Sequence, residues 1–238
     1  MDQLALLQSH GSFLFRFFHV FFGIIWIGLL YYFNFVQTPF FAETDAATKS
    51  GAIQKLVPRA LWWFRWGAMY TWITGLALLL IAPLNQGALI WGTQWGTLIL
   101  PGAVFGTVMF LNVWFVIWPN QKIVIASTES VAKGGPANPK AAAAAARAGV
   151  ASRTNALFSI PLLFSMLSTT HLTFAYPIGE TSNYLAYSLV LGVLVIVIEA
   201  NALFGKLVGP LKTVRGVITA GLAFTAIFYC AMEKFLAV

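Results

Sequence analysis

The stretch FRFFHVFFGIIWIGLLYYFNF, residues 15–35, decides the fold class of this chain. It is long and apolar enough to cross a bilayer, whose core needs about 20 such residues per helix. Five similar segments follow, and the six predicted spans are residues 13–36, 60–82, 97–118, 154–175, 184–204 and 214–235. These runs are too long and too continuous for barrel strands. The sequence therefore predicts an all-α integral membrane protein, a bundle of about six transmembrane helices.

The composition supports this class and excludes others. Of 238 residues, 59% are hydrophobic and 9% are charged, and the mean hydropathy is +0.81. A soluble domain has about 25% charged residues, so a soluble enzyme and a nucleic-acid-binding protein are both excluded, although the net charge is +7. The single cysteine, Cys230, rules out an intramolecular disulfide, a cysteine zinc site, an iron–sulfur cluster held by this chain alone and a C-x-x-C-H haem attachment.

Basic residues occupy alternate connections between the predicted spans. Residues 37–59, 119–153 and 205–213 contain lysine and arginine, whereas 83–96 and 176–183 contain neither. Positively charged loops stay in the cytoplasm. We therefore expect both termini on the outer, periplasmic side of a multi-pass protein of the bacterial inner membrane. Residues 1–238 form a single domain in this interpretation, with a cytoplasmic loop at 119–153 whose alanine-rich part continues as a helix toward the fourth span.

Two histidines are predicted to lie at similar depth on the outer side. His19 falls about 9 Å below the outer start of the first span and His171 about 6 Å from the outer end of the fourth, at 1.5 Å per residue. Neutral imidazoles from facing helices suit the two axial positions of a haem b iron. Arg16 would pair with a propionate, and Gly23 would let the flat macrocycle approach the helix. The predicted cofactor site is therefore haem b held by His19 and His171, with Arg16 and Gly23 beside it.

Other interpretations of these residues stay open. His19 would equally serve as a hydrogen-bonding residue between helices, and His171 as an interfacial residue facing water. His10 lies outside the predicted span and is a surface residue or a replacement ligand. Glu199, near the inner end of the fifth span, suits proton transfer or quinol binding, and also simple pairing with Lys206. No catalytic residue is identified from the sequence.

Four motifs in residues 12–175 resemble successive blocks of the membrane domain of bacterial urate hydroxylase. They are RFFHVFFGIIWIGLLYYFNFVQTP, FRWGAMYTWITGLALL, FLNVWFVIWPNQK and SRTNALFSIPLLFSMLSTTH. The resemblance implies a multi-helix membrane domain, followed in the family by a periplasmic c-type cytochrome domain, and oxidation of urate to 5-hydroxyisourate with electrons passed to a respiratory chain. It matches His19 and His171 to family histidines, although Ser-Thr-Thr precedes His171 where related sequences often have asparagine.

One departure from the family separates two functional hypotheses. The sequence ends at Val238 without a C-x-x-C-H motif, so no cytochrome domain is expected in this chain. The first hypothesis is a membrane redox protein that binds haem b and passes electrons to a separate c-type cytochrome. The second is a non-catalytic accessory subunit of a larger respiratory or photosynthetic complex in the lipid bilayer. A transporter is a weaker reading, because the sequence shows no pair of broken helices or charge cluster at mid-membrane.

Overall fold

A computed structural model describes residues 3–172 and 182–236 of the chain, which are almost entirely helical. The helices are α1 (Gln3–Tyr31), α2 (Thr38–Glu43), α3 (Ala46–Lys55), α4 (Val57–Gln86), α5 (Gln94–Leu111), α6 (Trp118–Ala132), α7 (Ala141–His171), α8 (Tyr184–Phe204) and α9 (Val214–Phe235). Two π-helical turns, η1 (Tyr32–Gln37) and η3 (Asn112–Ile117), join α1 to α2 and α5 to α6. Short 3₁₀ turns, η2 (Ala88–Gly92) and η4 (Pro210–Lys212), precede α5 and α9.

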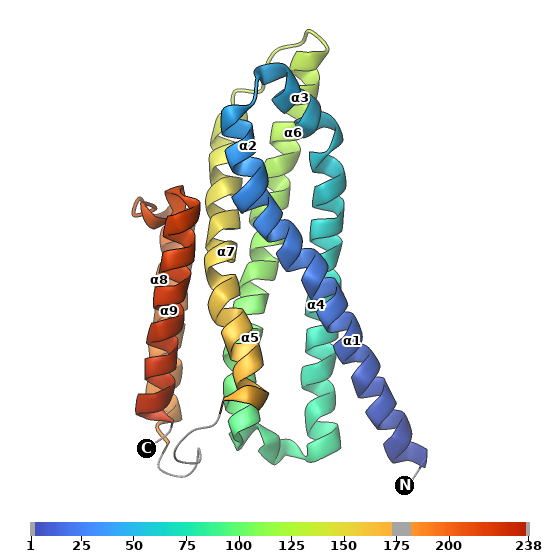
Figure 1. The fold of residues 1–238 in the computed structure, drawn as a ribbon, viewed down its shortest axis with the longest axis vertical. Helices are drawn as coiled ribbons and strands as arrows, with labels where there is room; N and C mark the ends of the chain where they lie inside the picture. The colour runs from blue at the N-terminus through green and yellow to red at the C-terminus, as the bar shows by residue number, and fades with distance from the viewer. Residues whose placement is uncertain (1–2, 173–181, 237–238) are drawn as a thin grey trace.

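Six helical segments in the described residues are long and apolar enough to span a membrane, as the sequence predicts. They are His10–Glu43, Val57–Gln86, Gln94–Ala132, Ala141–His171, Tyr184–Phe204 and Val214–Phe235. The chain is therefore a multi-pass integral membrane protein with lipid around it. Both ends of the described chain lie at the same end of the bundle (Figure 1). We call this the outer end, following the predicted orientation, and the opposite end, with α2 and α3, the inner end.

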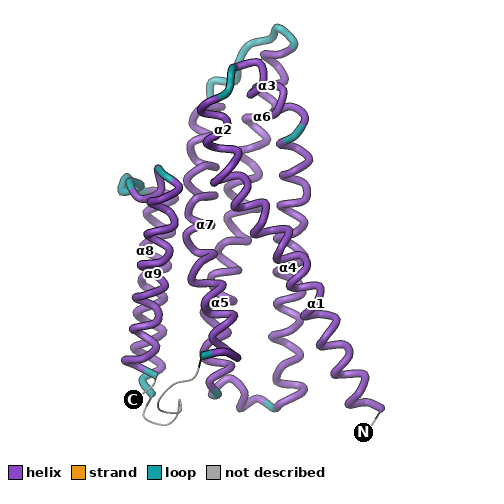
Figure 2. The backbone as a smooth tube through the Cα atoms, viewed as in Figure 1, coloured by secondary structure: helices purple, strands orange, loops and turns teal. Residues whose placement is uncertain are grey.

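The segment predicted as a loop at 119–153 is mostly helical. The third spanning segment continues through α6 to Ala132, and α7 begins at Ala141, so only residues 133–140 connect them. The alanine-rich run is part of α7, as expected. Residues 173–175, the predicted end of the fourth span, lie outside the described residues. The tube in Figure 2 shows this connection at the inner tip of the bundle.

Side-chain caps and a special glycine set the helix boundaries. Gly87 has φ +81° and follows α4, a conformation that favours glycine. The side chain of Thr93 accepts a hydrogen bond from the Gly96 amide at the start of α5, and Asn183 does the same for Ala186 at the start of α8. The chain thus reverses at short, locally specified turns.

The core of the bundle lies around α7. This helix contacts α5, α6, α8, α9 and η3. Half of its most apolar 18-residue stretch is buried, compared with 11% of the corresponding stretch in the first spanning segment. Phe158 on α7, Phe105 on α5 and Phe228 on α9 are fully buried and lie near one another. Helices α8 and α9 lie together beside α7, whereas the outer half of α1 crosses α4 and runs away from α7 (Figure 1).

Close packing of α9 on α7 depends on Gly221, so we predict that Gly221→Val destabilises the bundle. A Cβ atom at this position would lie 3.0 Å from the Leu157 carbonyl oxygen and 2.5 Å from Ile160 Cδ1. Overpacking of this kind costs about 1–3 kcal/mol. Thermal unfolding in detergent should show a lower midpoint for this variant. Gly28→Val is the control, because nothing lies within 4 Å of a Cβ there; an equal loss in both variants would contradict the packing argument.

Candidate functional site

His19 lies between α1 and α4, toward the outer end of the bundle. Its ring is half-buried, and Nδ1 lies 2.9 Å from the Thr71 carbonyl oxygen and 3.3 Å from Thr74 Oγ1. A carbonyl oxygen only accepts hydrogen bonds, so Nδ1 carries the proton in this contact. In the neutral imidazole, Nε2 then has the free lone pair. This is the tautomer that metal-binding histidines use, with the second ring nitrogen held by a backbone carbonyl.

Gly75 on α4 makes room for this imidazole. A Cβ atom at Gly75 would lie 2.8 Å from His19 Cε1 and 3.2 Å from Nδ1, closer than packed atoms approach. Any larger residue would push the ring away from its carbonyl partner. The position of the ring is thus specified by two residues of α4, Thr71 and Gly75, neither of which belongs to the predicted cofactor site.

The two other predicted residues of the first span differ in their surroundings. Gly23 packs near the same turn of α4 as His19, because a Cβ atom there would lie 3.9 Å from Thr71 Cγ2. Arg16 is exposed, with no hydrogen bond or ion pair to another described residue. The structure therefore brings His19 and Gly23 onto one part of α4 and leaves the arginine at the surface.

His171 is the exposed last residue of α7. No described contact joins it to His19, and in Figure 1 α4 lies between the outer half of α1 and α7. The structure thus does not bring the two predicted ligands together. A shared iron stays a prediction that rests on their similar depth. In the described part of the chain, no three His, Cys, Asp or Glu side chains gather as a metal site.

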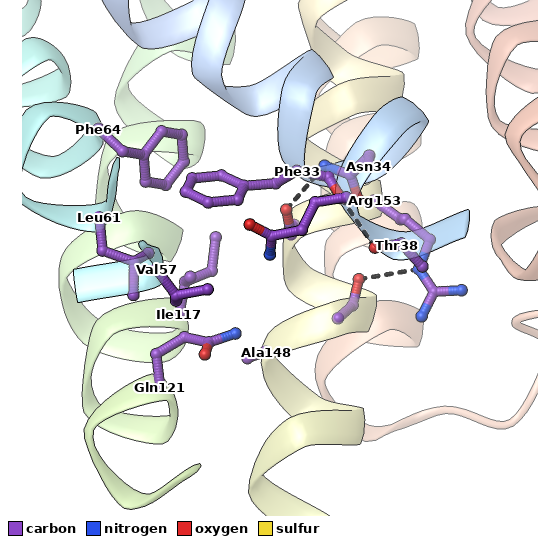
Figure 3. A pocket seen from close by; sticks show the side chains of 13 residues that line it. Phe33, Asn34, Thr38, Val57, Leu61, Phe64, Ile117, Gln121, Ala148 and Arg153 are labelled. Atoms are coloured by element: carbon purple, nitrogen blue, oxygen red, sulfur yellow. Dashed lines mark hydrogen bonds between the residues drawn. The ribbon is translucent and has the colours of Figure 1, made fainter. Parts of the chain in front are cut away.

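A second polar site lies at the inner end, in a small pocket between η1, α4, α6 and α7 (Figure 3). Its volume is about 70 Å³. The side chains that line it combine aromatic rings, amides, hydroxyls and one cation: Phe33, Asn34, Gln37, Thr38, Val57, Leu61, Phe64, Ile117, Gln121, Ala148, Gly149, Ser152 and Arg153. We call it the inner amide pocket.

The amides of this pocket differ in how fully they are bonded. Asn34 donates to the Leu30 carbonyl and to Ser152 Oγ, both at 2.8 Å. Gln37 Oε1 is buried and accepts no hydrogen bond from the described residues. Arg153 lies at the pocket edge and donates to the carbonyls of Gly149 and Leu211. The pocket therefore offers a free acceptor and a cation to a small polar molecule, and room for little more than that.

Sequence reasoning missed most of this pocket. Asn34, Gln37, Gln121 and Arg153 were not predicted as site residues. The sequence feature that could have indicated the pocket is a pair of short polar stretches next to a proline, VQTP at 36–39 and PNQK at 119–122. The two sites are also far apart. Fifteen residues of the first span separate His19 from Asn34, about 22 Å along the helix, so one small ligand does not reach both.

Glu199 belongs to a buried polar network rather than to an ion pair. Its Oε2 accepts from Asn112 Nδ2 at 3.1 Å, and the same amide donates to Asn155 Oδ1 at 2.9 Å. Asn155 in turn donates to the Met109 carbonyl at 2.9 Å. The expected pairing with Lys206 is absent among the described contacts. The network joins α8, η3 and α7, and reaches α5 through Met109.

Comparison with known families identifies the family to which the chain belongs. A model of the urate oxidase N-terminal family matches residues 90–228, more than half of the sequence. The chain belongs to this family, and it is a urate hydroxylase-like membrane protein. The matched range begins after His19 and includes α7 with His171. It also extends past residue 175, beyond the motifs quoted from the sequence. Comparisons with curated proteins and with solved structures gave no match.

The Asn112–Asn155 contact generates a stability prediction. Asn155→Leu removes the acceptor for Asn112 and the donor for the Met109 carbonyl. Each of these two hydrogen bonds contributes about 0.5–1.5 kcal/mol, so the thermal midpoint in detergent should fall by several degrees. Asn120→Leu is the control, because its amide donates to Val116, one turn earlier in its own segment. Similar midpoints for the two variants would contradict a structural role for the network.

Proposed function

We propose that this chain is a membrane redox protein of the urate hydroxylase type, with haem b bound at His19 and a c-type cytochrome as electron acceptor. The observation that carries the proposal is the contact of His19 Nδ1 with the Thr71 carbonyl, which leaves Nε2 as the unprotonated ligand atom. Family membership supplies the reaction class. The haem would supply one-electron chemistry; Thr71 and Gly75 would fix the ring that holds it.

The residues around His19 fit one axial ligand to such a group. The imidazole is held in one tautomer, Gly75 makes room for its ring, and Gly23 on α1 presents no side chain next to Thr71. The second axial ligand has no comparable contact among the described residues. His171 is the residue proposed from depth, and its helix lies apart from the outer half of α1 in Figure 1. The experiment therefore tests ligation by His19.

Haem binding is tested by the visible spectrum of the detergent-purified protein from haem-replete cells. We expect a reduced-minus-oxidised haem b signal that His19→Gly abolishes and His10→Gly leaves unchanged. Added imidazole should restore the signal in His19→Gly, which separates lost ligation from misfolding. Gly75→Ala should shift the signal, because the new methyl group displaces the ring. A colourless protein that co-purifies stoichiometrically with a larger complex would favour the accessory-subunit alternative.

Electron transfer is tested with urate and a purified c-type cytochrome. Oxidation of urate by water to 5-hydroxyisourate releases two electrons and two protons, so two ferric cytochromes should be reduced per urate consumed. The rate should fall at least tenfold in His19→Gly and remain unchanged in His10→Gly. Equal rates in all variants, or no reduction by a preparation that shows the haem spectrum, would contradict the proposed electron path.

A further inference from the structure

Two cationic side chains from different helices lie over one tryptophan at the surface of the bundle. The guanidinium carbon of Arg65, on α4, is 3.5 Å from the ring centroid of Trp118, on α6. The ammonium nitrogen of Lys122 is 5.5 Å from the same ring. Both are within the range of cation–π attraction. Arg65, Trp118 and Lys122 form what we call the α4–α6 cation cluster.

The cluster lies at the level of lipid headgroups. From Trp95 near the outer start of α5 to Trp118 there are 23 residues, about 34 Å of helix, and a bilayer core is about 30 Å thick. Tryptophan is enriched at both boundaries of that core. Trp118 therefore marks the inner boundary, and the two cations beside it face the phosphate layer.

The charges of this cluster are not neutralised by the protein. Among residues 3–172 and 182–236, neither Arg65 nor Lys122 forms an ion pair. Arg65 uses Nε for the Leu61 carbonyl at 3.2 Å, which leaves its terminal amino groups for another acceptor. On the membrane-core side of Arg65, farther along α4 toward the outer end, Ile73 and Leu76 are exposed, at 45% and 42%. Two cations without an ion-pair partner, at the inner end of an exposed apolar surface, match the headgroup and the acyl chains of an anionic phospholipid.

We infer that the α4–α6 cation cluster binds a phospholipid with a net negative headgroup. The phosphate would lie between the guanidinium and the ammonium group, and the acyl chains would lie along the exposed apolar side chains of α4 on the membrane-core side of Arg65, Ile73 and Leu76. A zwitterionic lipid carries its own ammonium group and gains less from two protein cations. This inference does not depend on haem or on the redox proposal, and it uses none of the residues placed in those sites.

The test is lipid titration of the delipidated, full-length protein, followed by native mass spectrometry. Cardiolipin should bind at least tenfold more tightly than phosphatidylcholine. The double variant Arg65→Gln/Lys122→Gln should bind cardiolipin about 30-fold more weakly, at about 1 kcal/mol for each basic residue near the membrane surface. The matched control is Lys212→Gln/Arg215→Gln, which removes two exposed cations at the same end and should keep the wild-type affinity.

Further measurements make the result decisive. Lys122→Gln alone changes an exposed side chain, so it should fold normally and show an intermediate loss of affinity. An unchanged affinity in the double variant, or an equal loss in the control, would overturn the inference. Displacement of cardiolipin by millimolar inorganic phosphate would also overturn it, because the site would then select a free anion. The haem spectrum of the double variant should stay unchanged, which separates this test from that of the proposed function.

Discussion

Buried side-chain amides that attach the π-helical turns to α7 are the interaction on which the rest of the structure depends. Each spanning segment that contains such a turn places an asparagine in it: Asn34 in η1 and Asn112 in η3. One donates to Ser152 and the other to Asn155, both on α7. Lipid offers no competing hydrogen bonds, so these contacts fix which faces of the helices meet. The buried aromatic side chains of the core then pack around α7.

The same arrangement separates the polar chemistry of the protein into two regions. At the inner end, where η1 meets α7, the amides and Arg153 surround a small pocket. At the outer end, α1 has left α7 and packs on α4 alone, and there His19 meets the Thr71 carbonyl. The tautomer of His19 is thus specified by α4, whereas His171 is the exposed last residue of α7. A cofactor at His19 would therefore lie near the surface of the bundle.

The candidate site was predictable from sequence only in part. The apolar context of His19 marked it as unusual, and Gly23 does lie near it, because both positions face the same helix. Thr71 and Gly75 were not predicted, since a backbone carbonyl and a missing Cβ leave no signal in residue type. The inner amide pocket was missed for a related reason: Gln37, Gln121 and Arg153 come from three segments, and each alone resembles an interfacial polar residue.

The sequence by itself determined the class, the six spans and the helical continuation of the alanine-rich run, because a bilayer requires about 20 apolar residues and internally bonded backbone wherever a chain crosses it. Those requirements act on each segment separately. The tertiary structure alone decided which spans are neighbours, that α7 lies at the centre and that α1 diverges from it. These outcomes depend on small contacts such as Gly221 against Leu157 and Asn112 against Asn155, which hydropathy does not encode.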